Sequence, residues 1–300
     1  ARSGWEVCGL VHQAEDAPPG VTAVRADLRD GARLPRLLDE CAPAAVVHLA
    51  AVADTGACQR DPEGTYPLNV AAPARLARLC AERGLPFAFA STDLVFAGTD
   101  APYAETAPPD PVCLYGRQKA LAEELVLAAH PGALVCRLPL MFGPPSPCSG
   151  AFLAAFLRGL KADLPQKLFT DEYRTPADAR CVSKGILALL GKASGIHHLG
   201  GPERLSRYAL GQLVAARFGF PPELLIPVRQ ADVSLACPRP PDTSLASFRA
   251  RRLGFSPLSP AAALERLDSE LLLHLQQERG TGKNSGLRCG MVLSRYNTTW

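Results

Sequence analysis

Residues Phe87-Ala-Phe-Ala-Ser-Thr-Asp93 join an apolar segment of strand length to three polar side chains. In open α/β sheets the carboxyl ends of parallel strands form the edge at which ligands bind. The segment therefore predicts a buried strand that presents a hydroxyl group at such an edge. Ser-Thr-Asp by itself more often forms a turn or a helix cap, so the interpretation depends on the sequence around it.

Similar apolar segments alternate with helical patterns through the first half of the chain. This alternation is typical of a parallel sheet covered by helices on both faces, and it predicts an α/β fold with a Rossmann-type doubly wound sheet over residues 1–145. The expected strands cover residues 6–11, 21–26, 45–49, 86–90 and 133–137, and the expected helices between them cover residues 34–41 and 67–83.

After Pro144 the pattern changes to helices separated by Gly and Pro, at residues 150–160, 182–190 and 206–218. We assign residues 146–270 to a smaller, mainly helical substrate-binding domain that is partly interleaved with the first. Residues 271–300 end in a polar, Gly-rich stretch without periodicity, which predicts a disordered or non-native tail.

Composition narrows the class of protein. The 300 residues carry 32 basic and 29 acidic side chains, and the absence of a dense basic run argues against nucleic acid as a partner. Ten cysteines without a CxxC pair are typical of reduced thiols, and no apolar stretch is long enough to cross a membrane, so we expect a soluble cytoplasmic protein. The adjacent His197 and His198 would point to opposite faces of a strand, and no metal site is expected.

A second motif, Tyr115-Gly-Arg-Gln-Lys119, follows the predicted strand end. A spacing of four residues places the phenol and the ammonium on one face of a helix, one turn apart. There the cation would stabilise a phenolate and so assist proton transfer. An exposed helical pair without chemistry is the competing interpretation of this spacing alone.

Together these motifs resemble the extended short-chain dehydrogenase/reductases, and within them the dTDP-4-dehydrorhamnose reductase-like (RmlD-like) group. The resemblance implies an NAD(P)-dependent oxidoreductase that reduces a keto group of a nucleotide-linked sugar. By motif, Tyr115 is the proton donor, Lys119 assists it and contacts the nicotinamide ribose, and Thr92 orients the substrate carbonyl. The matching segments lie between residues 4 and 267, at residues 91–98, 102–105, 111–123, 137–143, 169–176, 195–203 and, weakly, 238–242.

The resemblance also indicates where the cofactor would lie. Asp27 and Leu28 match the pair that meets the adenine ring, although an Asp capping a turn would look the same. The small residues Ala50 and Ala51 would allow close approach of the dinucleotide, and Leu138, Tyr115 and Lys119 are further expected cofactor contacts. His12 stands where an acidic residue would bind the ribose 2′-hydroxyl of NAD. The absence of that acidic residue favours NADP, but only mildly, because no arginine stands there to receive the 2′-phosphate.

Substrate contacts are expected from Thr92, Asp93 and Arg174, the last within the matching segment at residues 169–176. The same group contains the beta subunit of methionine adenosyltransferase, which resembles a reductase but serves another enzyme. A regulatory subunit is therefore the alternative function. A homodimer or a complex with a partner enzyme fits either function.

The sequence departs from the family at its beginning. No GxGxxG or GxxGxxG turn precedes the predicted strand at residues 6–11, so the first strand of the sheet and its glycine-rich turn are expected to be missing. The pyrophosphate of the cofactor would then lose the backbone N–H groups and the helix dipole that usually hold it. A truncated product without cofactor is a further alternative.

Overall fold

The computed structural model describes residues 5–12, 20–143, 152–267 and 291–296. Its centre is a seven-stranded sheet with the strand order β10-β5-β4-β3-β13-β1-β2. Every neighbouring pair is parallel except the two pairs that include β13, which confirms the predicted Rossmann-type fold. The strands are β1 (Trp5–Val11), β2 (Val21–Arg25), β3 (Ala45–His48), β4 (Phe87–Thr92), β5 (Leu134–Leu138), β10 (Gly195–His198) and β13 (Met291–Tyr296).

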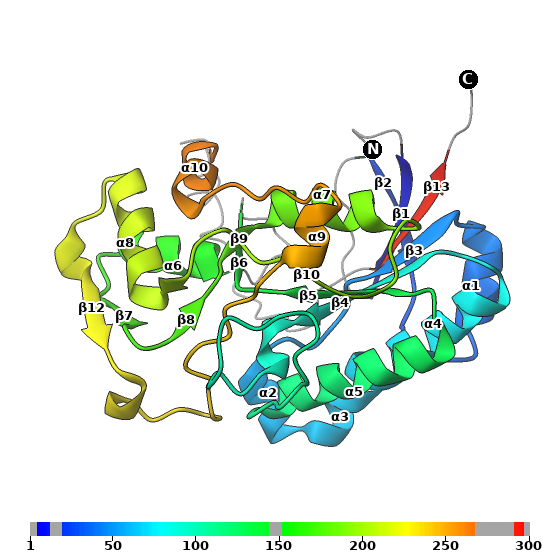
Figure 1. The fold of residues 1–300 in the computed structure, drawn as a ribbon, viewed down its shortest axis with the longest axis horizontal. Coiled ribbons are helices and arrows are strands. Elements are labelled where there is room, and N and C mark those ends of the chain that lie inside the picture. Colours follow the sequence, from blue (N-terminus) through cyan, green and yellow to red (C-terminus); the bar gives the residue numbers. More distant parts are fainter. Residues whose placement is uncertain (1–4, 13–19, 144–151, 268–290, 297–300) are drawn as a thin grey trace.

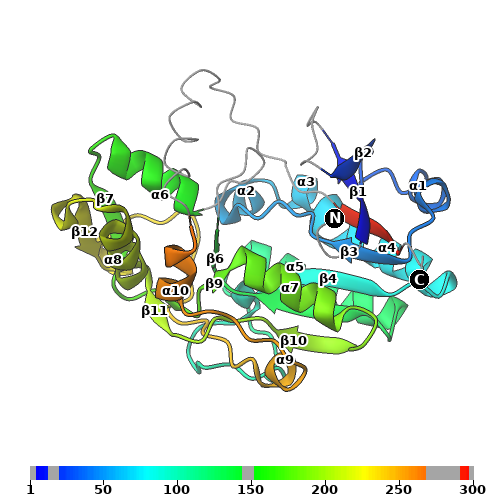
Figure 2. The ribbon, with the colours of Figure 1, turned by 90° about the horizontal axis from the view of Figure 1, so that it is seen from above.

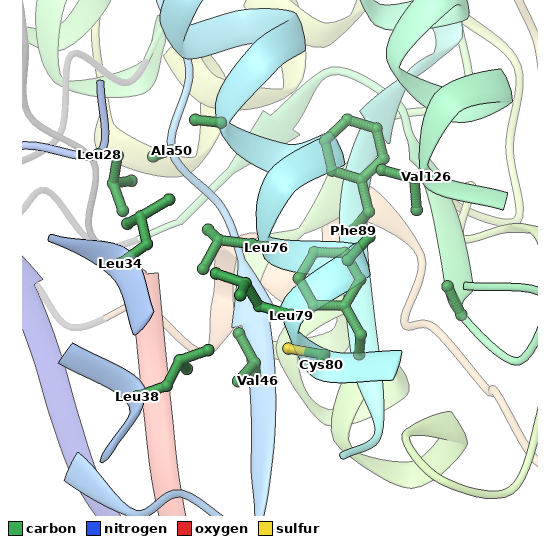
Figure 3. Packing of buried hydrophobic residues seen from close by; sticks show 14 of the residues in the cluster. Leu28, Leu34, Leu38, Val46, Ala50, Leu76, Leu79, Cys80, Phe89 and Val126 are labelled. Carbon is green, nitrogen blue, oxygen red and sulfur yellow. The ribbon is translucent and has the colours of Figure 1, made fainter. Parts of the chain in front are cut away.

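Helices cover both faces of this sheet (Figure 1). On one face lie α1 (Leu34–Cys41), α4 (Ala72–Glu82) and α5 (Leu114–Ala129), whose apolar side chains form a cluster with Val46, Phe87 and Phe89. Figure 3 shows Leu34 and Leu38 of α1 and Leu76 and Leu79 of α4 around Val46. The opposite face is covered by α7 (Ala179–Leu189) and α9 (Phe248–Arg252), which contribute to a second cluster with Ala88 and Leu134.

The strand β13 corrects the expectation for the tail. It lies between β1 and β3 and pairs antiparallel with both, from Trp5↔Tyr296 along one side and from Ala45↔Ser294 along the other (Figure 1). Residues 291–296 are therefore neither disordered nor outside the fold, and both neighbouring strands have ladder partners. The six residues Met-Val-Leu-Ser-Arg-Tyr include good strand formers. Their strand signal is weak when it is averaged over a longer stretch, because the neighbouring residues are polar and Gly-rich. The rest of the predicted tail lies outside the described residues.

A second, smaller group of elements stands beside the carboxyl edge of the sheet (Figure 2). Apolar side chains from its helices and strands form one separate cluster, which includes Leu157, Val214 and Leu264. The helices are α6 (Phe152–Lys161), α8 (Arg207–Phe218) and α10 (Pro260–Glu265), and the strands are β6 (Met141–Phe142), β7 (Gln166–Phe169), β8 (Tyr173–Arg174), β9 (Ala177–Asp178), β11 (Leu205–Ser206) and β12 (Leu225–Val228).

Short helices connect β3 to α4. They are α2 (Thr55–Arg60), α3 (Pro62–Tyr66) and the π-helix η1 (Pro67–Ala71), which continues directly into α4. The single helix expected at residues 67–83 is thus interrupted by a π-helical turn at its start. Within the described residues no helix is both long and apolar enough to cross a bilayer.

Candidate active site

The helix that carries Tyr115 and Lys119 begins tightly against the segment that follows β4. Cys113 caps α5 by accepting a hydrogen bond at Sγ from the Gly116 backbone N–H, at 3.5 Å. A Cβ atom on Gly116 would lie 2.1 Å from the backbone oxygen of Leu94, so a larger residue would push the helix away. The glycine of the Tyr-Gly pair thereby allows α5 to approach the end of β4, where Thr92 lies.

A cleft of about 550 Å³ opens at this edge, and both Thr92 and Tyr115 line it. The structure therefore brings together the hydroxyl of the first motif and the phenol of the second. Ala51, Asp93, Leu138 and Arg174, all predicted from the sequence, line the same cleft.

Lys119, one helical turn after Tyr115, is buried and is not among the residues that line the cleft. Its side chain is 1% exposed, and Nζ lies 3.8 Å from the centroid of the Phe89 ring, a cation–π distance. Its charge also affects the pKa of His48 at the end of β3. Burial and, second to it, the charge of Lys119 lower the pKa of His48 to about 3. Among the described residues neither ring nitrogen of His48 has a hydrogen-bond partner.

Thr92 and Asp93 are held in place by hydrogen bonds. Thr92 Oγ1 accepts from the backbone N–H of Leu94 and donates to Asp93 Oδ1, both at 3.2 Å. Asp93 Oδ2 accepts from the Thr243 hydroxyl at 2.8 Å and lies 3.4 Å from Arg174 Nε. Burial raises the pKa of Asp93, although Arg174 and the hydrogen bonds oppose this shift.

Three arginines surround one carboxylate on the far wall of the cleft. Glu172, 1% exposed, lies 2.6 Å from Arg239 Nε, 3.3 Å from Arg207 Nε and 3.5 Å from Arg174 Nη2. Burial opposes ionisation of Glu172, but the hydrogen bond from Arg239 and the charges of the other arginines together lower its pKa. Burial lowers the pKa of Arg207 to about 10, which leaves it charged at neutral pH. With Asp93 included, the group holds three cations and two carboxylates.

A smaller hollow holds the residues expected at the adenine end. Asp27, Leu28 and Ala51 line it together with His12 and Arg29. Ala50 is buried in the core beside it, near Leu28 (Figure 3). Ala51 lines both this hollow and the larger cleft, so the two belong to one edge of the sheet.

An arginine does lie near His12, contrary to expectation. Arg29 Nη2 is 3.5 Å from His12 Nε2, and the guanidinium donates to both carboxylate oxygens of Asp27. The hydrogen bond from Arg29 lowers the pKa of Asp27 to about 2. Asp27 Oδ1 also accepts from the Arg29 backbone N–H, so Asp27 does cap a turn, as its alternative interpretation predicted. Asp27 nevertheless lines the hollow as well. Strands β1 and β2 are parallel neighbours, so the turn after β2 lies beside the end of β1, which explains this approach across 17 residues.

A family model described as the RmlD substrate binding domain matches residues 2–270. The chain belongs to this family. A probable low-salt glycan biosynthesis reductase, Agl14, of Haloferax volcanii is 32% identical over 246 residues, which are 79% of this chain and 80% of that protein. The beta subunit of methionine adenosyltransferase 2 from Xenopus laevis is 30% identical over 241 residues, 78% of this chain and 72% of that protein.

Among solved structures, this member of the RmlD family is similar in fold to dTDP-4-dehydrorhamnose reductase of Bacillus anthracis in complex with NADP. The TM-score is 0.76 at 20% identity, over 84% of this chain and 91% of that one. The residues expected at the two ends of a nicotinamide dinucleotide line the smaller hollow (Asp27 and Leu28) and the cleft (Tyr115). Between them the central strand β13 runs antiparallel, so it does not lead into a phosphate-binding helix at this edge.

Sequence reasoning missed two amide side chains in this RmlD-family site. Asn69, fully buried in η1, accepts at Oδ1 from the Val52 N–H and donates from Nδ2 to the Val52 carbonyl. It also donates to Gln118 Oε1 at 2.7 Å. A buried asparagine inside a helical pattern is a signal for such a contact, since the helix backbone itself does not use its amide. Gln118 stands between Tyr115 and Lys119 in the sequence, where it carried no signal of its own.

Proposed function

We propose that the protein is an NAD(P)-dependent reductase that acts on a keto group of a nucleotide-linked sugar. The observation that carries this proposal is the single cleft lined by Thr92 and Tyr115, with a buried Lys119 one helical turn after Tyr115. Membership of the RmlD family supports the proposal.

In the proposed reaction each residue acts on the substrate carbonyl. Tyr115 donates its phenolic proton to the carbonyl oxygen, and the buried Lys119 ammonium stabilises the phenolate that remains. The Thr92 hydroxyl, whose oxygen is positioned by the Leu94 N–H, turns from Asp93 to donate to the same carbonyl oxygen. A bound nicotinamide would supply the hydride to the carbonyl carbon.

The arginines supply a site for the nucleotide part of the substrate. Arg174, Arg207 and Arg239 line the cleft, where Glu172 and Asp93 are the carboxylates that lie against them and Asp54 is a further acidic residue of the lining. A diphosphate suits such a cluster, because guanidinium groups bind phosphate oxygens in paired hydrogen bonds. We therefore assign the sugar end to Thr92 and Tyr115 and the diphosphate to the arginine wall.

For the cofactor we propose a preference for NADP. Arg29 and His12 at the adenine hollow would receive a 2′-phosphate, and Asp27 and Leu28 would hold the adenine. Ala50, Ala51 and Leu138 would lie along the dinucleotide, and Tyr115 and Lys119 at its nicotinamide ribose.

The test is reduction of a dTDP-linked 4-keto-6-deoxyhexose with NADPH, followed by absorbance. Tyr115→Phe should lower turnover about 100-fold or more while cofactor binding persists. Tyr66→Phe, at a side chain that is 44% exposed, is the matched control and should keep full turnover. Equal turnover of the Tyr115→Phe variant and the wild type would refute the assigned role.

A second function is favoured by the similarity to the beta subunit of methionine adenosyltransferase 2, which extends over 241 residues. In this case the chain would bind a catalytic partner, and its Tyr/Lys pair would not turn over substrate. Purification from native extract separates the two functions. A stoichiometric second protein without carbonyl-dependent NADPH oxidation supports the regulatory role, whereas turnover by the isolated chain supports the enzyme.

A further inference from the structure

The carboxamide of Gln118 has hydrogen-bond partners on both sides. The side chain is 6% exposed, and Oε1 accepts from Asn69 Nδ2 at 2.7 Å. Nε2 donates to the Pro62 carbonyl at 3.1 Å and to Thr65 Oγ1 at 3.0 Å. Turning the amide by 180° would oppose two N–H donors at Asn69 and two carbonyl oxygens at Pro62. The partners therefore determine its orientation.

This contact joins two parts of the site that the sheet does not connect. Gln118 lies on α5, next to Lys119 and one turn after Tyr115. Through Asn69 it reaches the backbone of Val52, whose N–H and carbonyl are both bonded to the Asn69 amide. Val52 follows Ala51, the residue that lines both the cleft and the adenine hollow.

The segment after β3 has no ladder of its own. Residues 49–54 form neither helix nor strand, and at Val52 the Asn69 carboxamide takes the place of a neighbouring strand. Two consecutive amide contacts therefore link this cofactor-facing segment to α5, and Cys58 Sγ also donates to the Val52 carbonyl at 3.2 Å. In the second of these amide contacts Gln118 fixes Asn69, which would otherwise keep only its bonds to Val52 and a 3.6 Å contact with Cys58 Sγ.

We propose that Gln118 is a positioning residue, which holds the segment around Ala51 and Val52 at the correct distance from Tyr115 and Lys119. The role in turnover rests on the proposed function, but the positioning itself does not. The hydrogen bonds of the Gln118 side chain do not include Thr92 or Tyr115, two of the residues that line the cleft. Gln118 therefore acts through Asn69. Its loss should therefore affect cofactor affinity before it affects the proton transfer at Tyr115.

The main variant is Gln118→Met, which keeps the length of the side chain and removes all three hydrogen bonds. Hydrogen exchange of the Val52 amide, measured without ligand, should become about tenfold faster, in line with the loss of one buried hydrogen bond. The Val135 amide on β5 should not change. Glu124→Met on the exposed side of the same helix is the control and should leave both amides unchanged.

Calorimetric titration with NADPH and steady-state kinetics complete the test. We expect Gln118→Met to weaken NADPH binding and raise its KM about tenfold, with a smaller effect on kcat. Gln118→Glu should weaken NADPH binding at pH 8, because its ionised carboxylate still accepts from Asn69 but opposes the Pro62 carbonyl, and it should recover towards wild type at pH 5, where a protonated carboxyl can both donate to Pro62 and accept from Asn69. A purely structural role would not produce this recovery of cofactor affinity.

Two results would overturn the inference. One is an unchanged Val52 exchange rate in a folded Gln118→Met protein, and the other is faster exchange at Val52 with unchanged NADPH affinity. If the wild type shows no turnover, the proposed function fails, but the exchange and binding measurements still decide the role of Gln118.

Discussion

Glu123 and Arg137 form an ion pair in the interior, with Arg137 Nη2 2.7 Å from Glu123 Oε2 and side chains that are 0% and 3% exposed for Arg137 and Glu123. Ser91 also donates its hydroxyl to this carboxylate, and Arg137 Nη1 lies 3.5 Å from His198 Nε2. The pair ties α5 to β5 one turn beyond Lys119. This arrangement gives Arg137 a structural role.

Removal of one partner should be more harmful than removal of both. Arg137→Met would leave the Glu123 charge buried and should lower the free energy of unfolding by about 3–5 kcal/mol. The double variant Glu123→Leu/Arg137→Met should recover most of that loss. Urea denaturation of the wild type and these two variants measures both effects, and a double variant no more stable than Arg137→Met would contradict the coupling.

Arg29 should distinguish NADPH from NADH. Arg29→Ala removes the cation beside His12 and should weaken NADPH binding about tenfold with little change for NADH, because only NADPH carries the 2′-phosphate. Arg33→Ala is the control, since Arg33 pairs with Glu40 on α1 outside the hollow. Titration of both dinucleotides checks the prediction, and equal losses for the two would assign the 2′-phosphate elsewhere.

His48 should make the fold sensitive to acid. Burial lowers its pKa from 6.5 to about 3, so between these values the unfolded chain takes up a proton that the folded chain does not. The stability contributed by neutral His48 is complete above pH 6.5 and is lost as the pH falls, by about 1.4 kcal/mol per unit. The unfolding free energy of His48→Leu should therefore decrease less between pH 6 and pH 5. A decrease equal to that of the wild type would show that His48 is protonated in the folded state.

The strand β13 should support the whole sheet. Leu293→Pro removes a backbone N–H from the ladder opposite Cys8 and Val46 and should lower the free energy of unfolding by about 3 kcal/mol or more. Leu293→Val keeps that N–H and is the control. Thermal and urea denaturation compare the two variants, and equal stability would mean that the ladder does not depend on this strand.

Features that depend on residues close together in the sequence were predicted correctly, whereas features that depend on contacts between distant segments were predicted only in part. The five parallel strands from β1 to β5 lie within two residues of their expected positions, because apolar runs and turn residues are local signals. The Tyr115 and Lys119 pair is also local, since a helical turn fixes it. The arginine wall was only partly predictable, because Arg174, Arg207 and Arg239 come from three separate segments.

Two further features, the approach of Arg29 to His12 and the direction of β13, depend on tertiary contacts that a short stretch of sequence does not reveal. Arg29 approaches His12 only because β1 and β2 are parallel neighbours. The direction of β13 was equally hidden, since a strand sequence does not state which partner it joins or whether it runs parallel or antiparallel to it.

The pairing of Trp5 with Tyr296 gives the sheet a contact of very high sequence separation at its centre. During synthesis, β1 and β2 can form their own hydrogen-bonded pair, but their backbone link to β3 requires residues that leave the ribosome almost three hundred codons later. Contacts of this kind slow folding, because a long loop must close before they form. The edge of β1 that pairs with β13 therefore stays open while all the residues between these two strands are synthesised, and this edge is where chaperone binding or misassembly would act on the nascent chain.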